Sequence, residues 1–160
     1  QTAKFEALCK ILHEDHVDKA IIFCRTRRDT SRLTDQLYRK GYRVQALHAG
    51  FTQPQRDRAI ADFRSGRLNL LVATDVAARG IDVDGITHVI NYDLPKFAED
   101  YVHRIGRTAR MKTTGRATSF VTSEDGLQLR AIEQLLGHAV PVAAGSARPS
   151  SCGTAISGAT

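Results

Sequence analysis

No part of this 160-residue chain approaches the roughly 20 consecutive apolar residues that a membrane-spanning helix requires. The sequence also lacks a secretory leader, and it begins at Gln1 rather than at a methionine. These features lead us to expect a soluble, cytoplasmic protein with no membrane partner. The start at Gln1 favours a piece of a longer chain.

Cysteine is scarce, which bears on disulfides and metal sites. Cys9, Cys24 and Cys152 are an odd number and form no C-x-x-C pair. This pattern supports neither a disulfide framework nor a zinc site, so we predict free thiols and no metal ligands. Cys24 ends the apolar run 20–24 and is expected to be buried.

The charge is unbalanced toward the positive sign. Lysine and arginine number 23 against 17 aspartates and glutamates, which gives a net charge of +6. A field of this sign favours nucleic acid or nucleotides, with an acidic membrane surface as the competing partner. A hydrophobic content of 42% and a charged content of 25% are ordinary for a globular domain with a core.

Hydrophobic periodicity alternates between short apolar runs and amphipathic segments, which predicts an α/β domain with a mostly parallel sheet and helices on both faces. The expected strands are 20–24, 43–47, 68–73, 87–92 and 117–121. Three expected helices are 3–14, 97–107 and 124–136. Two more are expected from their end signals: one is capped by Asp29 or Thr30 and ends before Gly41, and the other begins at a Thr52–Gln55 capping box and ends at Gly66. We predict a domain over 1–138 and a flexible low-complexity tail over 139–160.

Ligands of parallel α/β sheets bind at the carboxyl ends of the strands, so the polar loops that follow the strands are the candidate sites. Three of them stand out: Arg25–Arg28, His48–Arg56 and Ala73–Val83. Hydroxyl, guanidinium and glycine groups in such loops suit a sugar–phosphate backbone. Taken singly, each loop is equally consistent with a solvated turn or a helix cap.

Arg104, Arg107 and Arg110 recur every third residue, with His103 beside them. On a helical turn this spacing predicts a cationic clamp on one side, whose guanidinium groups would match the oxygens of a polyphosphate. The alternative is a solvated basic face.

With these segments together, residues 1 to about 137 resemble the carboxy-terminal RecA-like domain of superfamily 2 helicases, and within them the DEAD-box ATP-dependent RNA helicases. The resemblance implies a three-layer RecA-like fold. Four segments in order carry it: Ile21–Arg27 is similar to motif IV, Gln53–Arg56 to the Q-x-x-R motif, Ala73–Asp82 to motif V and His103–Arg110 to motif VI. The segment Asn91–Pro95 is also typical of the family.

The resemblance assigns roles to matching positions. Arg107 and Arg110 would be arginine fingers for the γ-phosphate of ATP, and Asp82 would contact the ribose. His103 would couple the nucleotide site to the partner domain, and Arg104 would serve the local charge network. Eight residues would lie along an RNA backbone without reading its sequence. They are Arg25, Thr26, Arg27, Gln53, Arg56, Thr74, Arg79 and Gly80.

Two elements of the family's ATP site do not occur in the 160 residues: the G-x-x-x-x-G-K-[ST] phosphate loop and the Asp-Glu-Ala-Asp segment. We therefore expect Mg²⁺ to be held mainly by an N-terminal RecA-like domain of the same protein, and expect this chain alone not to hydrolyse ATP. Ala49 and Ala109 stand where the family usually has glycine, a change that removes no charged group.

Two other functions stay open. A superfamily 2 DNA helicase or translocase would prefer DNA to RNA as its stimulating polymer. A non-catalytic nucleic-acid-binding or scaffold module would not need Arg107 and Arg110 at their spacing. The RNA, the pathway and the oligomeric state are not determined by these motifs.

Overall fold

The computed structural model describes residues 2–108, 115–143 and 154–159. Within these ranges no helix is long and apolar enough to cross a membrane. The elements in chain order are α1 (Thr2–Glu14), β1 (Ala20–Phe23), α2 (Arg27–Arg39), β2 (Val44–Leu47), α3 (Gln53–Ser65), β3 (Leu70–Ala73), α4 (Asp75–Ala78), β4 (His88–Asn91), α5 (Ala98–Ile105), β5 (Arg116–Val121), the 3-10 turn η2 (Ser123–Asp125), α6 (Gly126–Leu136) and β6 (Thr154–Ala159).

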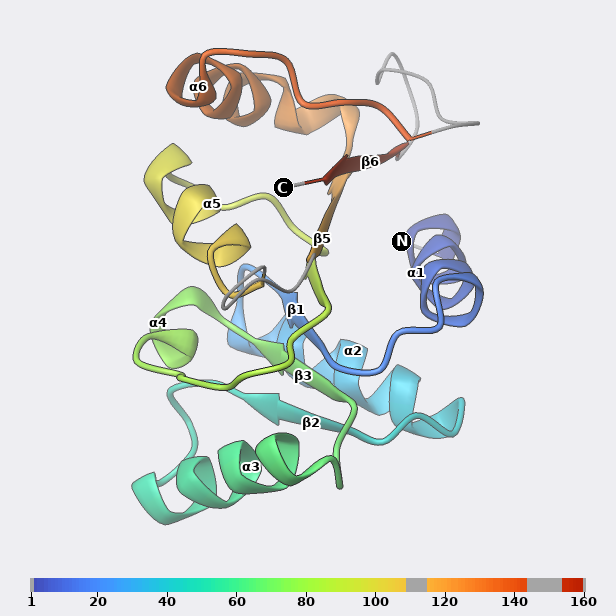
Figure 1. The fold of residues 1–160 in the computed structure, drawn as a ribbon, viewed down its shortest axis with the longest axis vertical. Coiled ribbons are helices and arrows are strands. Elements are labelled where there is room, and N and C mark those ends of the chain that lie inside the picture. Colours follow the sequence, from blue (N-terminus) through green and yellow to red (C-terminus); the bar gives the residue numbers. More distant parts are fainter. Residues whose placement is uncertain (1, 109–114, 144–153, 160) are drawn as a thin grey trace.

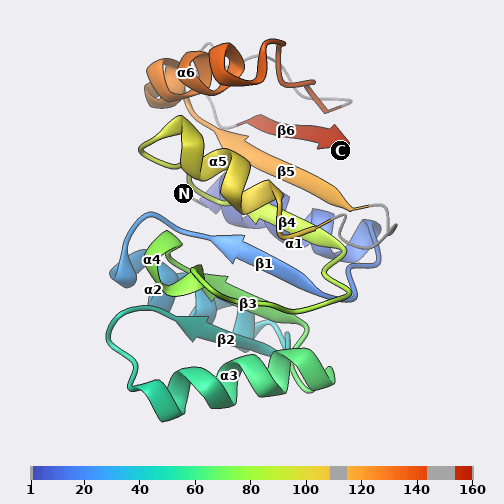
Figure 2. The same cartoon turned by 60° about the vertical axis from the view of Figure 1, so that its left-hand side comes forward.

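A single sheet organises the chain, with the strand order β2-β3-β1-β4-β5-β6 (Figures 1 and 2). The first five strands run parallel, as the alternation of strands and helices predicts. The order places β1 at the centre, where Ile21 pairs with Leu71 on one side and with Val89 on the other. Helices cover both faces of this sheet, so the predicted three-layer architecture is confirmed (Figure 2).

Successive strand residues point alternately into two separate cores, one on each face of the sheet. Because both faces are buried, the strands are continuous apolar runs in the sequence. Ile22 points into a core shared with α1 and α2, where Leu8 and Leu33 are buried. Ile21 and Phe23, on either side of Ile22, point into a second core with Phe63 of α3. Burial on both sides fixes the strand ends, and with them the loops that follow at the carboxyl edge.

The first turn of α2 starts earlier than predicted. Thr26, and not Asp29 or Thr30, is the N-cap: its backbone is extended and its hydroxyl accepts a hydrogen bond from the Asp29 amide at 3.1 Å. The Asp29 carboxylate in turn accepts a hydrogen bond from the Thr26 hydroxyl at 2.6 Å. The earlier start brings Arg27 and Arg28 into the helix, where positive charge opposes the helix dipole.

Helix α3 begins and ends as predicted. Thr52 and Gln55 form a reciprocal capping box, and Gly66 ends the helix in the left-handed conformation at φ 85°. The loop before this helix and the strand after it are thereby held in register with the sheet.

The segment expected to be a flexible tail differs from that expectation at both described parts. Val140 is buried in a third core with Leu129 and Ile132 of α6. Residues 154–159 pair antiparallel with β5 as the strand β6. Edge pairing of this kind uses backbone hydrogen bonds, so a segment poor in core-forming side chains can still add to a sheet.

His88 gives the fold a testable dependence on pH. Its buried ring faces Asp15 and lies near Arg116, and burial is the largest cause that lowers its pKa below 6.5, with Asp15 acting in the opposite direction. His88 therefore binds a proton more readily in the unfolded chain than in the folded one. The contribution of neutral His88 to the free energy of unfolding is complete above about pH 6.5 and falls as the pH drops below that value.

We expect the stability advantage of wild type over His88→Gln to shrink on acidification, by at most about 1.4 kcal/mol per pH unit. Urea denaturation of both proteins between about pH 7.5 and 5.5 measures it, because other titrating groups cancel in the difference. An advantage that stays constant over that range would show that His88 is not protonated more readily in the unfolded chain.

Candidate functional site

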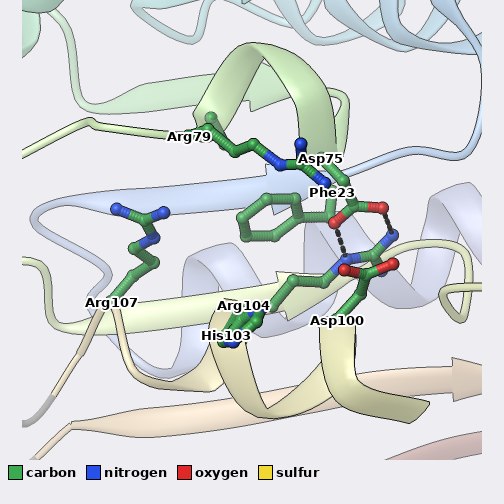
Figure 3. A pocket seen from close by; sticks show the side chains of 8 residues that line it. Phe23, Asp75, Arg79, Asp100, His103, Arg104 and Arg107 are labelled. Carbon is green, nitrogen blue, oxygen red and sulfur yellow. Dashed lines mark hydrogen bonds and ion pairs between the residues drawn. The ribbon is translucent and has the colours of Figure 1, made fainter. Parts of the chain in front are cut away.

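A pocket at the carboxyl edge of the sheet gathers four residues singled out by sequence: Arg79, His103, Arg104 and Arg107. We call it the arginine pocket, and its lining is Phe23, Asp75, Ala78, Arg79, Asp100, His103, Arg104 and Arg107. Figure 3 shows the ring of Phe23 in the middle, with Arg79 arriving from the end of α4 and Arg104 from α5. The strand ends of β1, β3 and β4 therefore meet here, as expected for a parallel sheet.

Arg104 is the internal anchor of this pocket and not part of an exposed clamp. Its guanidinium binds both carboxylate oxygens of Asp75, at 2.5 and 2.7 Å, and donates to the Asp93 carbonyl at 2.6 Å. It also lies 4.9 Å from the centre of the Phe23 ring, and only 2% of the residue is exposed. The prediction that Arg104 and Arg107 share one helical face is wrong, because α5 ends at Ile105 and Arg104 turns inward.

Asp75 had no assigned role in the sequence, yet it fixes the geometry of the pocket. It directly follows the strand β3 and the cap residue Thr74, at the first position of α4. A carboxylate at that position can satisfy a buried arginine from another segment. The sequence signal that could have indicated this pair was a carboxylate directly after one buried strand, Asp75, together with an arginine in the segment after another strand, Arg104.

Arg107 lies in the turn after α5, at the other end of the pocket from the Asp75–Arg104 pair (Figure 3). Its Nη1 donates to the Ile81 carbonyl at 2.7 Å, one residue before Asp82. The structure thus brings Arg107 next to the loop of Asp82, whose carbonyl accepts from Arg64 at 2.9 Å. His103 is exposed on the rim of the pocket. The predicted Arg110 lies outside the described residues.

The chemistry of the arginine pocket suits an anion. Arg79, Arg104 and Arg107 bring three permanent positive charges to it, against the two carboxylates of Asp75 and Asp100. Both oxygens of Asp75 are engaged by Arg104.

The size of the pocket also limits what it holds alone. Its volume is about 70 Å³, whereas small-molecule sites typically measure roughly 300–1,000 Å³. A nucleotide would need a second surface opposite these arginines.

The loop after β3 is tied to α3 by a side-chain contact. Arg56 donates from Nη2 to the Arg79 carbonyl at 2.6 Å. Gly80 follows with φ at 75°, a conformation that side chains disfavour, so the backbone turns here without a Cβ. Thr74 caps α4 with an extended backbone but without a side-chain hydrogen bond. The Arg56–Arg79 contact thus joins the segments of two motifs, while Thr74 is buried beside them.

The predicted residues at the end of β1 divide into two groups. Arg25 has intramolecular partners, although 49% of its side chain is exposed: its guanidinium donates to the Leu94 carbonyl at 3.3 Å and lies 3.6 Å from Asp125. Thr26 caps α2, and Arg27 is exposed on the first turn of that helix. Gln53 is also exposed, with its amide donating to Asp57 at 2.7 Å.

A second hollow of about 570 Å³ lies beside the first turn of α2. We call it the α2 hollow, and its lining is Thr26, Arg27, Arg28, Ser31, His48 and Gly50. Ser31 received no role from the sequence, because a single serine in a helix carries no signal until the loop of His48 folds against it. Burial, and then the charge of Arg27, lower the pKa of His48 below 6.5, so its imidazole is neutral at physiological pH.

Comparison with known proteins places similar sequences in one family. The profile of the family described as helicase conserved C-terminal domain matches residues 3–112. The DEAD-box ATP-dependent RNA helicase CshA of Bacillus licheniformis is 47% identical over 131 residues, which are 82% of this chain and 27% of that protein. Eukaryotic initiation factor 4A of Caenorhabditis elegans is 45% identical over 81% of this chain and 32% of its own length. The chain thus spans about a third or less of these curated relatives.

Solved structures show the same fold at comparable identity. The Escherichia coli DEAD-box protein SrmB, bound to regulator of ribonuclease activity A, has a TM-score of 0.80 and 38% identity, covering 85% of this chain and 80% of that one. Dbp5 of Saccharomyces cerevisiae, bound to RNA, ADP and BeF3, has a TM-score of 0.75 and 38% identity, covering 84% of this chain and 36% of that one.

Proposed function

Because this chain belongs to the helicase conserved C-terminal domain family, as the C-terminal RecA-like domain of a DEAD-box helicase, we propose that it supplies half of an ATP site and part of an RNA-binding surface. The whole protein would couple RNA-stimulated ATP hydrolysis to local separation of RNA strands. The arginine pocket is the observation that carries this proposal. It is cationic, it lies at the carboxyl edge of the sheet, and it is too small to enclose a nucleotide alone.

In the ATP site, Arg107 and Arg110 would stabilise the charge that develops on the γ-phosphate during transfer. Arg107 is suited to this, because the Ile81 carbonyl braces its guanidinium within the pocket. Asp82 would accept from the ribose, and His103 on the rim would contact the N-terminal RecA-like domain. That domain would bring the phosphate loop and the groups that hold Mg²⁺.

On the RNA side, the surface that joins α3 to the loop after β3 supports backbone recognition. Arg56 bridges to this loop, and Gly80 lets a nucleic-acid strand approach the backbone closely. Thr74, Arg79 and Gln53 extend the same surface, and Arg27 and the Thr26 cap add the end of β1. Arg25 would join this surface through the exposed half of its side chain, while its contacts to Leu94 and Asp125 hold the loop in place. The RNA-bound structure of Dbp5 supports RNA, and not DNA, as the polymer.

Arg56→Ala in the full-length protein tests the RNA surface. Removing one phosphate contact should weaken single-stranded RNA binding and reduce the slope of log K against log salt by about 1. Fluorescence anisotropy over a series of KCl concentrations, with an oligouridylate and an oligothymidylate in parallel, measures both quantities. Arg130→Ala, an exposed arginine of α6, serves as the control.

An unchanged salt slope in Arg56→Ala would remove this residue from the RNA surface. Stronger binding and stimulation by the DNA polymer would favour the DNA helicase or translocase. RNA binding that is indifferent to ATP, with no turnover, would favour the non-catalytic module.

A further inference from the structure

The α2 hollow contains a hydrogen-bond chain that the proposed function does not use. The Gly50 amide donates to Nδ1 of His48 at 3.1 Å, and Nε2 of the same ring lies 3.1 Å from the Ser31 hydroxyl. Ser31 and His48 come from α2 and from the loop after β2, 17 residues apart. These hydrogen bonds therefore link two segments that line the same hollow.

The donor and acceptor roles in these two hydrogen bonds follow from the Gly50 amide. A backbone amide can only donate, so Nδ1 of His48 accepts, and in the neutral imidazole the proton is carried by Nε2. That N–H donates to the Ser31 oxygen. The Ser31 hydroxyl hydrogen then has to find a different acceptor, and among the described residues this hydroxyl makes no second hydrogen bond.

The imidazole is held firmly enough to impose this direction. A Cβ at position 50 would lie 2.9 Å from Cε1 of His48, so only glycine allows this approach. The Phe51 ring packs against the imidazole with a centroid separation of 4.7 Å. The Nε2 proton is therefore aimed at Ser31 by packing on the ring.

We propose that His48 is a positioning residue that turns the Ser31 hydroxyl into a dedicated hydrogen-bond donor for a backbone phosphate of single-stranded RNA in the α2 hollow. This inference rests on the proposed RNA-binding function. Arg27 and Arg28, which line the same hollow on the first turn of α2, attract the phosphate by charge, while Ser31 fixes its position. His48 itself does not touch the RNA.

Two substitutions of His48 separate positioning from simple support of the loop. In His48→Asn the amide oxygen can replace Nδ1 and keep the Gly50 contact, but nothing reaches Ser31. In His48→Gln the longer amide can replace Nε2 and still donate to Ser31. A positioning role predicts that glutamine rescues RNA binding and asparagine does not, whereas a purely structural role predicts the reverse.

The measurement is the affinity of the full-length protein for a fluorescein-labelled oligouridylate with a non-hydrolysable ATP analogue, at several KCl concentrations. Ser31→Ala and His48→Asn should each weaken binding about three- to tenfold, the effect of one lost hydrogen bond, and the double variant should be no weaker than either. Their salt slopes should match that of wild type, because a neutral donor releases no counterions, whereas Arg27→Ala should reduce the slope by about 1.

Wild-type affinity in Ser31→Ala would overturn the inference, as would asparagine rescuing where glutamine fails. If Arg56→Ala weakens RNA binding while these variants do not, this inference fails and the RNA surface stands. If the wild-type protein does not bind the oligouridylate at all, both fail.

Discussion

Arg107→Ala in the full-length protein is expected to lower RNA-stimulated ATP hydrolysis by roughly 10³-fold or more, which is about 4 kcal/mol of activation free energy. An arginine that meets the γ-phosphate only as charge develops acts on the transition state more than on bound ATP. We therefore expect kcat to fall while the affinity for nucleotide is largely kept. Turnover in the presence of saturating RNA, together with binding of a fluorescent ATP analogue, measures the two separately.

The controls for this prediction address charge and folding. Arg107→Lys keeps the charge but loses the planar fork, so it should recover little of the activity. Arg130→Ala removes an exposed arginine of α6 and should behave as wild type. Arg107→Ala also loses its bond to the Ile81 carbonyl, so its melting temperature has to be compared with that of wild type. Full turnover in a folded Arg107→Ala protein would leave the pocket a binding role only.

Asp75→Ala should destabilise the domain by about 3 kcal/mol, which is at the lower end of the effect of breaking a buried ion pair. Arg104 would keep its buried charge and lose both carboxylate contacts. We place the effect at the lower end because 28% of the Asp75 side chain is exposed, so water can reach part of the site. Urea denaturation measures the free energy of unfolding, and the melting temperature should fall by roughly 6–12 °C.

A double variant tests the reason for this loss. In Asp75→Ala combined with Arg104→Met no buried charge is left without a partner, so part of the stability should return. Asp84→Ala removes an exposed carboxylate and should change stability by no more than about 0.5 kcal/mol. Strictly additive losses in the double variant would mean that the two side chains stabilise the domain independently.

Local patterns were sufficient for the order of the five parallel strands and the longer helices, but not for the short helix α4 or the edge strand β6. The capping box of Thr52 and Gln55 and the left-handed stop at Gly66 depend on neighbours in sequence, and both occur as predicted. The apolar strands could likewise be predicted, because burial on both faces leaves no polar alternation. At the start of α2 both predicted caps, Asp29 and Thr30, were wrong, since Thr26 is the residue with the extended backbone.

The tertiary structure decided which cation of the pocket is buried and paired with a carboxylate. Sequence spacing treats Arg104 and Arg107 alike, but Asp75, 29 residues earlier than Arg104, draws Arg104 into the interior. The end of α5 at Ile105 then frees Arg107 to brace against the loop of Asp82. A contact between distant segments has no periodic signature, so only folding reveals it.

The sequence by itself determined the fold class, the ordered motifs and the family, because these depend on residue type and on spacing along the chain. Only the tertiary structure decided that Arg104 is buried against Asp75, that Arg56 joins α3 to the loop after β3, and that Ser31 meets His48. The physical reason is that parallel strands bring loops from distant segments to one edge of the sheet. Which side chains then pair there depends on distances that the sequence does not contain.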